Sequence, residues 1–270
     1  MPGSDERRAS PVAVLTALGF LLPVGLYLWL ISADAVDTLR ADQWFDVRLI
    51  RHSFDGTLRF GMLWAQHGEN RIFFQNLITL VLAHVVHFNV IVEDYLSAAL
   101  LIGAIVLMVL SHHRRSPSTP WIAYCPVAIV LLSVAQYGGA LYGFAIGWYL
   151  VLFALAIALF LLDRPDLTWI ALSSAIAAGV FASFSSLQGL FVWPVGLALL
   201  LQRARGRWLV GGWVAAGFVT ACLYFFDWDS QQGSVSYAAH HLPVTLRFFF
   251  FTVGDVVGVR LPNAPSGAQY

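Results

Sequence analysis

Two aspartates between the first and second apolar stretches of the chain could carry acid–base chemistry. Asp42 and Asp46 are four residues apart, on either side of Trp44 and Phe45. On a helix, this spacing places both carboxylates on one face. One carboxylate could then deprotonate an acceptor hydroxyl, or the pair could hold a divalent metal ion. The alternative is a helix at the membrane surface that Trp44 and Phe45 anchor, with both aspartates in water.

A second cluster of ionisable side chains lies in W-A-Q-H-G-E-N-R-I, just before another apolar stretch. It contains His67, Glu69 and Arg71. Arg71 could bind a phosphate through paired hydrogen bonds, and Glu69 could orient His67. A zinc-protease motif is excluded, because the second histidine that it requires at a fixed spacing is missing. The alternative is a helix start in which Arg71 only extends toward lipid headgroups.

Short polar residues also gather in S-F-S-S-L-Q-G, before an apolar stretch that contains Trp193. Gln188 and its serine neighbours could bind a sugar or a lipid headgroup, although such residues more often cap and pack helices. His240 and His241 are adjacent, so they cannot easily share one metal ion on a regular helix. We interpret these two histidines as loop residues.

The remaining sequence places these residues at a membrane. Hydrophobic residues make up 59% of the chain and charged residues only 11%, with a mean hydropathy of +0.74. A soluble domain would have about a quarter charged residues. Several apolar stretches reach the roughly 18–20 residues that cross a bilayer. The sequence therefore predicts an all-α polytopic membrane protein, and its formal net charge of zero gives no indication of nucleic-acid binding.

We expect about eight transmembrane helices, each long enough to approach the bilayer thickness. The predicted spans are Pro11–Ile31, Tyr95–Leu110, Trp121–Gln136, Phe144–Leu162, Leu167–Ala182, Leu190–Leu201, Leu209–Phe225 and Leu246–Val259. The stretch Ile72–Val92 carries a polar stripe that includes Asn76 and Thr79, so we predict that it lies at the outer interface. With that placement every cluster of arginines falls on the cytoplasmic side, as the positive-inside rule requires.

This arrangement predicts one transmembrane domain over residues 1–260, followed by a tail over residues 261–270. Residues 33–93 form an outer loop with interfacial helices. Arg7 and Arg8 precede the first span, which we interpret as an uncleaved signal anchor with its N-terminus in the cytoplasm. We expect an integral protein of the bacterial plasma membrane.

The order of these parts resembles the GT-C superfamily of membrane glycosyltransferases, which includes the protein O-mannosyltransferases and the aminoarabinose transferases. A first span leads to a long outer loop with an early acidic residue, here Asp42 in A-D-Q-W. A histidine motif, H-G-E-N-R-I-F-F, then precedes an interfacial helix, and a span that ends at Arg114 and Arg115 follows. The segment F-S-S-L-Q-G-L-F-V-W-P-V-G-L is similar to the later polar-then-apolar span of the family.

The resemblance implies transfer of a sugar from a polyprenyl-phosphate donor to an acceptor at the outer membrane face. Asp42 matches the loop acid that serves as a base or helps to hold a metal, and the motif from His67 to Arg71 matches the region near the donor phosphate. The chain departs from its relatives at Gln43 and Asn70, where they often carry a second aspartate and a second histidine. It is also shorter than most of them, which indicates a truncated relative.

Two other functions are compatible with the sequence. The first is a non-catalytic membrane protein that binds lipid or a partner. The second is a transporter, which the sequence disfavours because the predicted spans contain no acidic residue before Asp255. Ion-coupled transport usually requires such residues within the membrane.

Overall fold

The computed structural model describes residues 10–229 and 234–255. The chain divides into two compact units, residues 1–228 and 229–270. Helices make up nearly all of the regular structure in the described part, which contains only one two-stranded sheet. The prediction of a single domain over residues 1–260 stays a prediction, and the predicted tail lies outside the described residues.

Within the described residues, five segments are long and apolar enough to cross a membrane. They are α1 (Pro11–Asp34), α5 (Val90–Arg115), the segment Trp121–Ala140, the segment Gly143–Leu162 and α11 (Arg207–Phe225). The structure thus fits the predicted all-α, multi-pass membrane protein. The count of eight spans is not confirmed, because three of the predicted spans correspond to shorter apolar helices.

Two of the five candidate spans consist of more than one helical element. Trp121–Ala140 contains the 3₁₀ helices η1 (Trp121–Tyr124) and η2 (Val134–Gln136), with α6 (Cys125–Leu131) and α7 (Tyr137–Ala140). Gly143–Leu162 contains η3 (Gly143–Ala145) and α8 (Ile146–Leu162). The shorter apolar helices of the same unit are α9 (Trp169–Ser183) and α10 (Val192–Gln202), which η4 (Leu187–Phe191) precedes.

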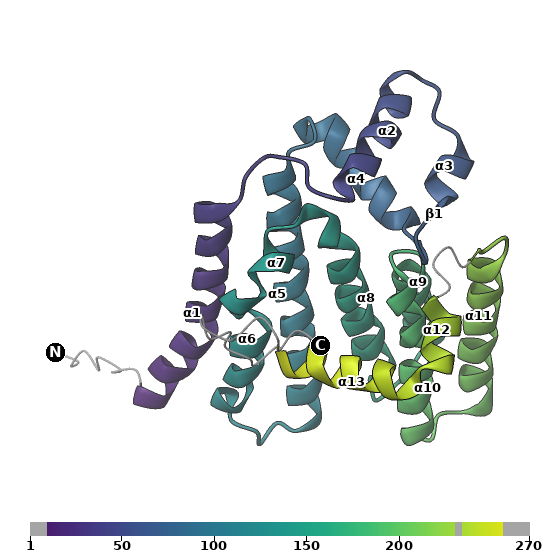
Figure 1. Cartoon of the computed structure of the whole chain (residues 1–270). Coiled ribbons are helices and arrows are strands. Elements are labelled where there is room, and N and C mark those ends of the chain that lie inside the picture. Colours follow the sequence, from purple (N-terminus) through teal and green to yellow (C-terminus); the bar gives the residue numbers. More distant parts are fainter. Residues whose placement is uncertain (1–9, 230–233, 256–270) are drawn as a thin grey trace. The chain divides into compact units, whose positions relative to one another are not determined.

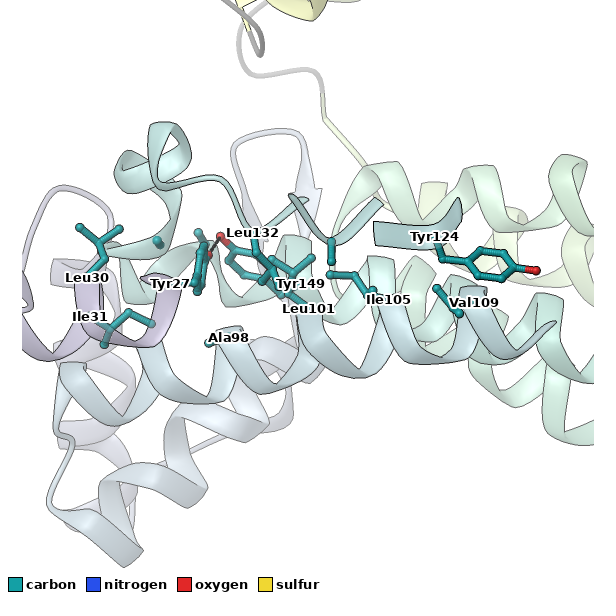
Figure 2. Close-up of a cluster of buried hydrophobic side chains, with 13 residues drawn as sticks. Tyr27, Leu30, Ile31, Ala98, Leu101, Ile105, Val109, Tyr124, Leu132 and Tyr149 are labelled. Atoms are coloured by element: carbon teal, nitrogen blue, oxygen red, sulfur yellow. Dashed lines mark hydrogen bonds between the residues drawn. The ribbon is translucent and has the colours of Figure 1, made fainter. Parts of the chain in front are cut away.

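Helix α5 is the central element of the first core cluster. Its apolar side chains pack against α1 and the segment Trp121–Ala140, as Figure 2 shows for Tyr27, Leu101 and Leu132. The hydroxyls of Tyr27 and Tyr149 lie 3.2 Å apart in this cluster and share a hydrogen bond. Because α5 has 26 residues, its length of about 39 Å exceeds a bilayer core of about 30 Å.

The C-terminal end of α5 is held to α8 and α10 by a buried carboxylate. Asp163 accepts hydrogen bonds from the guanidinium groups of Arg115 and Arg203. Burial alone would raise the pKa of Asp163, but the hydrogen bonds and charges of the two arginines outweigh it and lower this pKa. Arg115 and Arg203 belong to the arginine clusters that the positive-inside rule places in the cytoplasm. Through Asp163 they also join the ends of α5, α8 and α10.

The region between α1 and α5 forms a polar cap, which we define as residues 35–89. It contains α2 (Gln43–Phe54), α3 (Phe60–Trp64), the hairpin of β1 (Gln66–His67) and β2 (Asn70–Arg71), and α4 (Phe73–Val86). Figure 1 shows α2, α3 and α4 together at one end of the bundle of the first unit. Helix α2 packs on α4, and α4 contacts α8.

Helix α4 corresponds to the stretch predicted to lie at the outer interface. The polar stripe that motivated this placement faces the protein interior, because Gln75, Asn76 and Thr79 are buried while Val81 and Val85 are exposed. The Gln75 side-chain amide donates to the carbonyl oxygen of Phe144, across 3.1 Å. The stripe thus binds the cap to the bundle, and the interfacial placement of α4 stays a prediction.

The second unit contains α12 (Ser234–His240) and α13 (Leu242–Asp255) among its described residues. Helix α13 overlaps the predicted last span, Leu246–Val259, of which residues 256–259 lie outside the described residues. His240 is the last residue of α12 and His241 lies between α12 and α13, so the interpretation as loop residues holds for His241 and is wrong for His240. The side chain of Asp255 is not among those described.

Candidate functional site

Helix α2 buries two polar side chains near its N-terminus, whereas the neighbouring aromatic side chains are largely exposed. Gln43 and Asp46 are buried at 0% and 3% exposure, whereas Trp44 and Phe45 are each 64% exposed. The exposure of both rings is compatible with the alternative in which they anchor a membrane surface, and this role stays a prediction. The burial of Asp46 contradicts the other part of that alternative, in which both aspartates lie in water.

A small cavity of about 80 Å³ lies beneath α2. Asp46, Arg48 and His67 contribute polar side chains to its wall. The other lining residues come from α2, α3, the hairpin and α4: Phe45, Leu49, Met62, Ala65, Gln66, Ile72 and Asn76. Since a water molecule occupies roughly 30 Å³ of liquid, this cavity can hold a few waters or one small polar group of a larger ligand.

Asp42 lies outside the cavity wall but approaches His67, a lining residue that is 25 positions away in the sequence. The His67 Nε2 atom lies 3.6 Å from the Asp42 Oδ2 atom. The ring of His67 also contacts the rings of Phe45 and Phe144, with centroids 4.5 and 5.0 Å away. The Asp42 side chain is 51% exposed, so the pair lies at the boundary between protein and solvent. A carboxylate beside an imidazole is a common arrangement for general base catalysis.

Asp46 has the environment of an acid that stays protonated. Burial raises the pKa of its carboxyl group to about 8, and the nearby carboxyl groups of Glu93 and Asp42 add to the shift. At neutral pH Asp46 is therefore mostly neutral, whereas the exposed Asp42 lies beside a histidine. The two aspartates that the sequence pairs by spacing thus differ in environment.

Glu93 and Asp94 are two further buried acids, which sequence reasoning missed. They lie within α5 at 1% and 2% exposure, and the prediction that no span before Asp255 carries an acidic residue is wrong. That prediction began the span at Tyr95, just beyond them. The signal that could have located the start is Asn89, whose side chain accepts a hydrogen bond from the Val92 N–H and caps α5.

The H-G-E-N sequence forms the turn of the β1–β2 hairpin and is not the start of a helix. Gly68 has a φ of +57°, which a two-residue hairpin turn requires and glycine adopts readily. Glu69 lies in the turn, and its carbonyl oxygen accepts a hydrogen bond from the Tyr224 hydroxyl at 3.0 Å. The hairpin presents His67 to the cavity and holds Arg71 against α11.

Arg71 is buried, with 3% exposure, and its guanidinium donates to three backbone carbonyl oxygens. The acceptors belong to Trp64, Tyr224 and Phe226, with distances of 3.0 Å to Trp64 and 2.5 Å to Tyr224. The guanidinium also lies 5.2 Å from the centre of the Trp64 ring. These contacts join the hairpin to the end of α11, so Arg71 has a structural role in this conformation.

Gln188 lies outside the wall of the cavity. It is exposed and accepts a hydrogen bond from the Ser186 hydroxyl. Ser186 in turn contacts the Asn70 side chain, whose oxygen also accepts the Leu187 N–H at 3.0 Å. Gln188 is therefore connected to the back of the hairpin, and the structure does not bring it to Asp46 or His67.

A metal centre has no support from the arrangement of side chains. In residues 10–229 and 234–255, no group of three or more His, Cys, Asp or Glu side chains is placed to hold a metal ion. The predicted metal-binding role of the Asp42–Asp46 pair stays a prediction, and one member of the pair is mostly neutral at pH 7.

Comparisons with protein-family models, with curated proteins and with solved structures found no match to this chain. The fold defines the class, an all-α protein whose apolar helices fit a membrane. The function is therefore argued from the cavity and its side chains.

Proposed function

We propose that this chain is a membrane transferase that moves a sugar from a polyprenyl-phosphate donor to an acceptor hydroxyl at the outer membrane face. The proposal keeps the function implied by the GT-C resemblance. The observation that carries it is one cavity lined by an acid, a base and a cation, which are Asp46, His67 and Arg48. Asp42 lies beside His67 outside the cavity wall. An acid, a base and a cation are the groups that glycosyl transfer to a hydroxyl requires.

In the proposed reaction, His67 with Asp42 takes the proton of the acceptor hydroxyl. The acceptor oxygen forms a bond to the anomeric carbon of the sugar as the bond from that carbon to the phosphate oxygen breaks. The electron pair leaves with the polyprenyl phosphate, whose charge Arg48 stabilises. The neutral carboxyl of Asp46 donates a hydrogen bond to a substrate oxygen.

Arg48 replaces Arg71 as the phosphate ligand in this proposal. Its side chain lines the cavity and, within the described residues, forms no hydrogen bond or ion pair. The donors of Arg71 point to backbone carbonyls instead. Glu69 and Gln188 have no part in the reaction as proposed, because neither lines the cavity.

The cap also supports a location at the membrane surface. Trp44 and Phe45 of α2 are both largely exposed, and aromatic side chains of this kind concentrate at the headgroup level of bilayers. A lipid-linked donor would reach a cavity at that level without leaving the membrane. The N-terminus lies in the cytoplasm in this proposal, as the arginine distribution predicts.

Binding of undecaprenyl phosphate to the purified protein in nanodiscs tests the phosphate site. Arg48→Gln removes a charged hydrogen-bond donor that is worth about 1.5–3 kcal/mol, so the dissociation constant should rise about 10- to 150-fold. Arg51→Gln is the matched control, because Arg51 lies on the same helix but is 80% exposed and paired with Asp55. Equal affinities for the two variants would contradict the proposal.

Proton-coupled transport is a second candidate, which the buried Glu93 and Asp94 favour. These residues lie in the first two turns of α5, about 5–6 Å from its start, and not near its middle. Transporters usually bind their coupling ions near the bilayer midplane. Proton uptake into proteoliposomes driven by a pH gradient, abolished by Glu93→Gln, would favour transport over transfer.

A further inference from the structure

Three buried carboxyl groups gather where the cap meets α5. Asp46 comes from α2, and Glu93 and Asp94 come from α5. Within the described residues no arginine or histidine nitrogen lies within 4.0 Å of any of the three, and the chain contains no lysine. A buried carboxylate without a paired cation is costly, so a compensating ligand is required.

The hydrogen bonds to Glu93 come from neutral groups. The Gln43 side-chain Nε2 lies 3.3 Å from its Oε2 atom, and the Thr79 hydroxyl lies 3.4 Å from its Oε1 atom. The direction of the Gln43 amide is determined on its other side, because its Oε1 atom accepts the Arg40 backbone N–H at 3.0 Å. The Gln43 amide can therefore only donate to Glu93.

Gly143, the first residue of η3, packs against both Glu93 and the cap residue Gln43. A Cβ atom at Gly143 would lie 2.4 Å from the Glu93 Oε2 atom, so only glycine allows this approach. Such close packing leaves no room for the hydration shell of an ionised carboxylate. Glu93 is thus held in a polar but dry environment.

Asp94 carries the second, independent observation. Its Oδ1 atom and the Ser97 hydroxyl, one turn further along α5, are buried and have no hydrogen-bond partner within the described residues. Asp94 interacts electrostatically with Glu93, with Arg40 and with the hydroxyls of Tyr27 and Tyr149. A buried carboxylate oxygen that accepts no hydrogen bond is costly when the group is ionised, and a proton removes that cost.

We propose that Asp46, Glu93 and Asp94 form a proton-binding site that stays loaded at neutral pH and exchanges with the solvent through the cavity at Asp46. A proton satisfies both conditions, because it neutralises the carboxyl group and supplies a hydrogen-bond donor. The titratable and charged groups around Asp46 are Asp42, Tyr142, and the cavity residues Arg48 and His67. Gln43 and Thr79 face Glu93, and Arg40, Tyr27 and Tyr149 face Asp94. This site goes beyond the proposed transfer reaction and does not depend on it.

Infrared spectroscopy of the purified protein in nanodiscs at pH 7 tests the site. A protonated carboxyl group absorbs at a higher frequency than a carboxylate, and its band shifts in D₂O. We expect the wild type to show this band, and Asp46→Asn, Glu93→Gln and Asp94→Asn each to lose part of it. Asp55→Asn is the control, because Asp55 is exposed and paired with Arg51, so the band should be unchanged.

Two results would overturn the proposal. One is the absence of the band in the wild type at pH 7, a measurement that does not depend on whether any variant folds. The other is loss of the band on addition of Na⁺ or Mg²⁺, which would show that the site takes a metal cation. The proposed transferase function is tested separately by lipid-phosphate binding to the Arg48 variants, so either idea can fail alone.

Discussion

Asp46→Asn should change how the stability of the protein depends on pH. The carboxyl group of Asp46 has a pKa of about 8 in the folded protein and a usual value of 3.8, which we take for the unfolded chain. Between these values the folded protein holds one proton more than the unfolded chain. The stability from this group is therefore fully present below about pH 4 and is lost as the pH rises toward 8.

The magnitude follows from one bound proton. The free energy of unfolding should fall by about 1.4 kcal/mol for each pH unit between about pH 5 and pH 8, because of Asp46 alone. Over the whole interval the difference in pKa corresponds to at most about 6 kcal/mol. Asparagine is nearly isosteric and has no proton to lose, so the variant should lack this part of the slope and gain stability relative to wild type as the pH rises.

Unfolding in mixed detergent micelles at several pH values measures the effect. The difference between wild type and Asp46→Asn should itself change with pH, whereas Asp55→Asn, at an exposed site of the same cap, should give a curve parallel to that of the wild type. Parallel curves for Asp46→Asn and wild type would refute the reasoning. They would show that Asp46 titrates at the same pH in the folded and unfolded chains.

Three further predictions concern the parts that hold the site. Asp163→Asn should destabilise the protein by about 1–3 kcal/mol in the same unfolding assay, because Arg115 and Arg203, which are partly exposed, lose a buried carboxylate that accepts their hydrogen bonds, and a change below about 0.5 kcal/mol would argue against the three-helix contact. Arg71→Lys should destabilise by about 1–3 kcal/mol, since an ammonium cannot reach three carbonyls, while lipid-phosphate affinity stays unchanged; the reverse pattern would restore Arg71 to the site. In a variant without native cysteines, Asp55→Cys should react with an impermeant thiol reagent added outside whole cells and Ser118→Cys should not, and strong labelling of Ser118→Cys would reverse the topology.

The all-α membrane class could be predicted from the sequence because it depends only on local quantities. Hydropathy over about 20 residues and the low charge content suffice to identify helices such as α1 and α5. The number of spans could not be obtained in this way, since α9 has 15 residues and α10 only 11, and such lengths do not decide whether a helix crosses. Hydropathy also misplaced the start of α5. The predicted span began after Glu93 because a charged residue lowers the local hydropathy, although the helix itself begins at Val90.

The candidate site was predicted only in part. Asp42, Asp46 and His67 were selected from residue type and spacing. The structure brings Asp46 and His67 to one cavity and places Asp42 beside His67. Arg71, selected by the same reasoning, turned out to bind carbonyls from the end of α11, a contact between residues far apart in the chain. The spacing of residues in the sequence does not show which arginine will donate to carbonyl oxygens of a distant helix end.

The sequence by itself determined that ionisable side chains concentrate between the first two membrane helices. Only the tertiary structure decided which of them are dry, which are paired and which face a cavity. Asp42 is the N-cap residue of α2 and Asp46 lies one turn further along, yet the Asp42 side chain is half exposed and Asp46 is buried. Burial and neighbouring charges determine the protonation of a carboxyl group, and both arise from contacts that form when distant segments pack together.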